Sequence, residues 1–113
     1  MKWKAPVIVT AILSLAFASP VRSMTVGDYA SRRAEQNITF YIAGVGAGFY
    51  YAMNVAKTTG QSRLYCPTSG PGPSGEFYKH VLDSYLASQG TSINPATSIE
   101  TVLLGILMKQ FPC

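Results

Sequence analysis

The sequence predicts an all-α fold, a small bundle of three to four helices with one disulfide. Apolar residues recur at helical intervals of three and four along residues 38–56, 77–86 and 99–108. No segment shows the strict alternation of apolar and polar residues that marks a half-buried strand. Glycine and proline gather between these segments and separate them.

Residues 1–18 have the pattern of a secretory signal peptide. Two lysines precede an uncharged, mostly apolar run that ends in Ala16-Phe17-Ala18, with small residues at positions −3 and −1. The run is shorter than the ~20 residues of a bilayer-spanning helix, although an uncleaved anchor is the alternative. We therefore expect cleavage after Ala18, or after Ser23 as a second possibility. Residues 19–113 then form a single helical domain without a stable membrane span.

The charge of the exported chain argues against nucleic acid as a partner. Without the two signal lysines, seven basic residues stand against five acidic ones. A nucleic-acid interface needs clustered lysine and arginine, and only Arg32 and Arg33 are adjacent.

The two cysteines, Cys66 and Cys113, are expected to form a disulfide, because export leads to an oxidising compartment. Closing so long a loop stabilises a chain by roughly 4 kcal/mol in the chain-entropy estimate. A reactive thiol at Cys66 is the alternative.

The first helical segment starts near Gly27 and continues without a turn signal to about Ala56. One face of it is apolar over its second half, which is typical of a helix packed on a core. That face comprises Ile38, Tyr41, Ile42, Val45, Phe49, Ala52, Met53 and Ala56.

A second face of this helix carries small residues in the stretch YIAGVGAGFYYAM, residues 41–53. A dinucleotide-binding loop is excluded, because its glycines must follow a strand and open a helix. A membrane-dimer face, with Gly44 and Gly48 as a G-x-x-x-G pair, is an alternative. We favour close helix packing, within this chain or against a second copy. The predicted packing and dimer residues are Gly44, Ala47, Gly48 and Tyr51.

Residues 58–75 form a loop rich in glycine and proline, and long ordered loops often carry function. Proline restricts such a loop and the disulfide anchors one end. A plain connector is the alternative. The residues expected to contact a partner are Tyr65, Thr68, Ser69, Pro71 and Pro73.

Two further helices follow. Ser74 is a suitable N-cap for the first, which should end before Gly90. Asn94 as a cap and Pro95 in the first turn predict the start of the second, and Pro112 should end it.

No motif indicates catalysis, a metal or a cofactor, so we expect none of them. Glu76, His80 and Asp83 share one helix face, but three residues on one exposed face enclose a zinc ion poorly. A nucleophilic pair of Cys66 and His80 would compete with the disulfide. The tyrosines and the stiff loop are more typical of a binding surface.

Five short motifs occur in a recognisable order. They are Tyr41-Ile42-Ala43-Gly44-Val45, Tyr65-Cys66-Pro67, Val81 to Leu86, Pro95-Ala96 and Phe111-Pro112-Cys113. This order resembles the Rap/Tai family of secreted immunity proteins, which protect Gram-negative bacteria from peptidoglycan-cleaving amidase toxins delivered by type VI secretion systems.

The resemblance covers roughly residues 24–113. It implies a helical protein of the periplasm, often a homodimer, that inhibits an amidase by covering its active site and is not itself an enzyme. The alternative function is a small periplasmic stress chaperone or another helical binding module.

Overall fold

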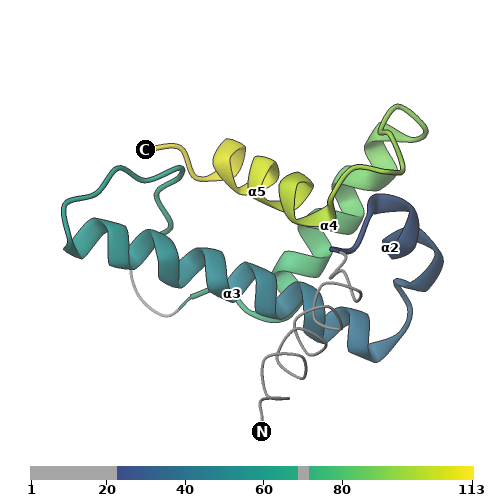
Figure 1. Ribbon diagram of the computed structural model, residues 1–113, viewed down its shortest axis with the longest axis horizontal. Coiled ribbons are helices and arrows are strands. Elements are labelled where there is room, and N and C mark those ends of the chain that lie inside the picture. Colours follow the sequence, from purple (N-terminus) through teal and green to yellow (C-terminus); the bar gives the residue numbers. More distant parts are fainter. Residues whose placement is uncertain (1–22, 69–71) are drawn as a thin grey trace, which may run out of the picture.

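The computed structural model describes residues 23–68 and 72–113, and within these ranges the protein is all-α with four helices and no strands (Figure 1). The predicted fold class is therefore confirmed. The helices are α2 (Val26–Arg32), α3 (Gln36–Thr58), α4 (Gly75–Gln89) and α5 (Ile99–Gln110). The predicted signal peptide, with its cleavage position at Ala18, lies outside the described residues.

The core lies where α3, α4 and α5 meet, and all three pairs of these helices are in contact (Figure 1). The apolar face predicted for α3 faces this core, with Ile38 and Ile42 buried and Phe49 and Met53 packed against them. The buried core residues are Tyr29, Ile38, Ile42, Tyr65, Tyr78, Val81, Leu82, Ile99, Leu103, Ile106 and Leu107.

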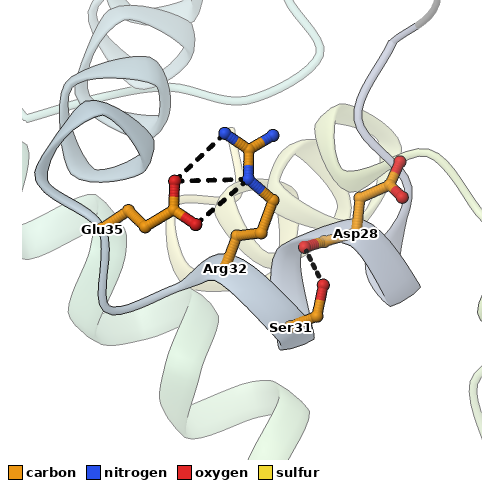
Figure 2. A network of polar contacts seen from close by, with 4 residues as sticks. All are labelled: Asp28, Ser31, Arg32 and Glu35. Atoms are coloured by element: carbon orange, nitrogen blue, oxygen red, sulfur yellow. Dashed lines mark hydrogen bonds and ion pairs between the residues drawn. The ribbon is translucent and has the colours of Figure 1, made fainter.

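The continuous helix predicted from Gly27 to Ala56 is wrong, because the chain turns at residues 33–35 and forms α2 and α3 separately. The Arg32 guanidinium turns back to the Glu35 carboxylate, 3.1 Å away, and supports this turn (Figure 2). The N-terminus of α2 is capped by a capping box between Thr25 and Asp28. The turn lets α2 place Tyr29, which is fully buried, against α4.

The limits predicted for α4 are confirmed. The Ser74 hydroxyl accepts a hydrogen bond from the Phe77 amide at 3.2 Å, which satisfies one of the free amides of the first turn. Gly90 ends the helix with a φ of 59°, a backbone conformation that glycine adopts without strain.

The start predicted for α5 is wrong, since the helix begins at Ile99 after the cap residue Ser98. The segment before it is used for a tertiary contact. Gly27 donates its amide to the Pro95 carbonyl at 3.0 Å, and Val26 donates to the Thr97 carbonyl at 2.8 Å. Because these carbonyls bind the first turn of α2, they are not available to a helix that begins at Pro95.

The Cys66–Cys113 disulfide is present, with the two Cα atoms 4.9 Å apart. The Cys66 amide also donates to the Phe111 carbonyl at 2.8 Å. The bridge confirms the predicted pairing and excludes the alternative of a reactive thiol at Cys66. It fixes the loop after α3 to the end of α5.

Candidate functional site

The residues predicted to contact a partner differ in burial, because some lie in the core and others on the surface. Tyr65 is only 2% exposed, and its ring lies 6.4 Å from the Phe111 ring in the core. Its predicted role as a contact residue is therefore wrong, because its side chain is part of the hydrophobic core. Thr68 is exposed and Pro73 is half-buried. The predicted residues Ser69 and Pro71 lie outside the described residues.

The buried state of Tyr65 predicts a loss of stability at high pH. Burial, and secondarily the neighbouring Tyr78, raises the pKa of Tyr65 from 10.0 to about 12. Because the folded state holds this proton more tightly, the contribution to stability is complete below pH ~10 and falls as the pH rises towards ~12. The unfolding free energy of Tyr65→Phe, measured by urea denaturation, should fall less over this interval than that of the wild type. Tyr51→Phe, at a position exposed in the single chain, is the control and should follow the wild type at concentrations where the protein is monomeric.

One face of α3 is apolar and open to solvent. Phe40, Tyr51 and Val55 are 66%, 67% and 60% exposed, and three such side chains on one helix face are more informative than a single exposed one. Gly44 and Gly48 lie between them on the same face, and added Cβ atoms there would meet nothing within 4 Å. We call Phe40, Gly44, Ala47, Gly48, Tyr51 and Val55 the open face of α3. No charged residue occurs from Gln36 to Ala56.

The glycines that allow close packing inside the chain are different ones. A Cβ on Gly46 would lie 2.3 Å from the Tyr78 ring, and a Cβ on Gly75 would lie 2.6 Å from that of Ala43. Within the described residues, the predicted packing role of Gly44 and Gly48 is therefore wrong for contacts inside one chain. The sequence spacing does not distinguish Gly46 from Gly44 and Gly48, because these three glycines differ only in whether they face α4.

Polar contacts join the helices behind the open face. The Tyr29 hydroxyl donates to Asp83 at 2.5 Å, and Lys79 lies 2.8 Å from the same carboxylate. On α5, Glu100 accepts hydrogen bonds from the hydroxyls of Tyr41 and Ser98. These carboxylates hold α2 to α4 and α3 to α5.

Within the described residues, the side chains predicted to share a face with the single histidine are not gathered into one site. His80 and Glu76 are exposed, whereas Asp83 is occupied by its contacts with Tyr29 and Lys79. Among the described residues, no group of three or more His, Cys, Asp and Glu side chains could hold a metal ion. Cys66 is in the disulfide and cannot pair with His80 as a nucleophile.

A groove of about 730 Å³ lies between α4 and α5, and the sequence reasoning missed it. Its floor contains Val81 and Ile106, which are buried. Its rim carries hydroxyl groups, His80 and Lys109, and no acidic side chain lines it. The apolar periodicity of each helix does not by itself indicate a groove, because the groove depends on how the two helices pack. The other lining residues are Phe77, Ser84, Tyr85, Ser88, Ile93, Thr97, Thr101, Val102, Gly105 and Gln110.

Over the described parts of the chain, no helix has both the length and the hydropathy needed to cross a bilayer. Comparison with models of known families, with curated proteins and with solved structures gives no match for this chain. The two exposed apolar features, the open face of α3 and the groove between α4 and α5, are the candidate binding sites.

Proposed function

We propose that this protein is a periplasmic immunity protein that binds and inhibits a peptidoglycan amidase toxin delivered by a type VI secretion system. The observation that carries the binding role is the open face of α3. Three large apolar side chains there are each at least 60% exposed, on a helix without a charge along its central part. Exposed apolar patches on a folded protein mark interaction surfaces. The class of partner rests on the order of the sequence motifs.

The open face suits a second copy of the chain. If two α3 helices pack antiparallel about a point between Ala47 and Gly48, Tyr51 of each copy lies opposite Gly44 of the other. Phe40 then lies opposite Val55. Tyr51 therefore faces a glycine, Phe40 makes an apolar contact with Val55, and the same surface serves both copies, as a twofold interface requires. Each Tyr51 ring is already placed by an edge-to-face contact with Tyr50, with ring centroids 5.6 Å apart.

The loop after α3 is the proposed contact with the amidase. Leu64 is 57% exposed, and Thr68 is exposed beyond it. The disulfide at Cys66 holds the backbone between these two residues. A loop fixed in this way loses little conformational entropy on binding, which favours affinity.

Size-exclusion chromatography with light scattering, combined with an amidase assay, tests this function. We expect the protein alone to elute as a dimer and to form a complex with one peptidoglycan amidase, whose activity is then lost. Leu64→Asp should weaken the complex without changing the dimer. Gly48→Leu should instead produce a monomer, because the added side chain separates the two α3 helices.

Two results would contradict the proposal. Capture of no amidase, with suppression of the aggregation of unrelated proteins, would favour the chaperone alternative. A Gly48→Leu variant that folds and remains dimeric would exclude the open face as the dimer interface. Lys57→Leu, at an exposed position on the same helix outside the open face, is the control and should remain dimeric.

A further inference from the structure

We propose that the groove between α4 and α5 binds a long-chain carboxylate, with the alkyl chain on its apolar floor and the carboxylate at the end formed by His80 and Lys109. This site is separate from the open face of α3, since no residue of α3 lines the groove. The proposal therefore goes beyond the immunity function.

The two ends of the groove differ in chemistry. The Phe77 ring, at the start of α4, lies 6.2 Å from the Phe111 ring, which follows α5. The helices are therefore antiparallel along the groove, and His80 lies at the same end as Lys109. The other end is formed by Ser88, Ile93, Thr97 and Thr101, none of which is charged.

The charges around the groove favour an anionic ligand. Lys109 is exposed at the rim, and no lining residue is acidic. The carboxylates of Asp83 and Glu100, which belong to the same two helices, are bonded to Tyr29 and Tyr41 instead. An anionic head group at the Lys109 end thus meets a cation and no carboxylate among the lining residues, since the exposed Glu76, one turn before His80, does not line the groove.

The size of the groove and its apolar floor favour a ligand with an alkyl chain. A volume of about 730 Å³ lies within the range of small-molecule sites, which is ~300–1,000 Å³. From Thr101 to Lys109 the helical rise of ~1.5 Å per residue gives a length of about 12 Å. Gly105 lies midway, and nothing lies within 4 Å of where its Cβ would be, so the wall is open at its centre. An extended, flexible chain fits this shape better than a compact ring system.

Calorimetric titration with octanoate, decanoate and dodecanoate, below the concentrations at which they form micelles, tests the proposal. We expect saturable binding to one site, tighter by up to roughly fourfold for each buried methylene. Dodecyltrimethylammonium has the same chain with a cationic head and should bind more weakly. Lys109→Gln should weaken dodecanoate binding by roughly two- to fivefold, as expected for an exposed ion pair. Lys57→Gln, at the far end of α3, is its control and should leave binding unchanged.

Gly105→Leu tests the location of the site. The new side chain enters the groove and should abolish saturable dodecanoate binding. Ala52→Leu is the control, because it introduces the same side chain at an exposed position of another helix, outside both the groove and the open face of α3. It should bind dodecanoate like the wild type. If Gly105→Leu does not fold, Ser84→Leu makes the equivalent change from the α4 wall.

Several outcomes would overturn the proposal. These are no saturable binding of any carboxylate, equal binding of the cationic amphiphile, or a folded Gly105→Leu variant that binds dodecanoate like the wild type. A Gly105→Leu variant that loses an amidase complex while keeping dodecanoate binding would identify the groove as a protein-docking surface instead. The immunity function is tested separately, by the amidase assay with the wild-type chain, so that either proposal can fail without the other.

Discussion

Replacing both Cys66 and Cys113 with serine should lower the free energy of unfolding by about 4 kcal/mol in the chain-entropy estimate. The two cysteines are 47 residues apart in sequence, and the bridge restricts this long loop in the unfolded chain. A domain of this size is stable by only ~5–15 kcal/mol, so the loss is a large fraction of the total. The bridge also holds the Tyr65 ring against Phe111, and loosening this contact adds to the effect.

Urea denaturation of the oxidised wild type, the reduced wild type and the double serine variant measures this loss. The reduced wild type should resemble the variant, and a reducing agent should not change the variant further. A decrease of less than ~1 kcal/mol would show that the unfolded chain is already restricted without the bridge. In that case the bridge would serve to position the loop for its partner rather than to stabilise the fold.

The parts of the fold that local chemistry decides could be predicted from the sequence. Ser74 caps α4 with its own hydroxyl, and Gly90 ends that helix because it accepts a positive φ. The disulfide followed from having two cysteines in a chain expected to be exported. In each case the deciding residue lies within a few positions of the feature, or has only one possible partner.

The errors arose where distant contacts decide the local structure. No glycine or proline marks the turn at residues 33–35, which forms because Tyr29 is buried against α4. Similarly, the segment around Pro95 has a helix-start sequence, but its carbonyls bind the amides that begin α2. Neither contact could be predicted without the arrangement of the helices.

The candidate sites were predicted only in part, for the same reason. The open face of α3 includes all four predicted residues, Gly44, Ala47, Gly48 and Tyr51, but the sequence does not indicate the exposure of Phe40 and Val55. The groove between α4 and α5 depends on how two helices pack, and no single segment of the sequence contains that information.

Gly46→Ala should destabilise the fold, whereas Gly44→Ala, two residues earlier in the same helix, should stabilise it. Both changes remove a helical glycine, which favours the helix by up to ~1 kcal/mol. At Gly44 the new methyl group meets nothing within 4 Å, so this gain is retained. At Gly46 it would lie 2.3 Å from Cγ of Tyr78, the buried ring atom that is attached through Cβ to the backbone of α4 and cannot easily move away. The overlap must move α3 and α4 apart, and overpacking of this kind lowers the free energy of unfolding by about 1–3 kcal/mol or more.

Because the two substitutions are identical and share one helix, their opposite signs isolate the contact with Tyr78. Urea denaturation should be carried out at concentrations where both variants are monomeric, so that dimer formation does not contribute. Combining Gly46→Ala with Tyr78→Ala should remove most of the penalty attributed to Gly46→Ala, since the ring that causes the overlap is then absent. Equal stabilisation by both single changes would mean that α3 and α4 do not cross at Gly46, and the arrangement of the core around Tyr78 would have to be different.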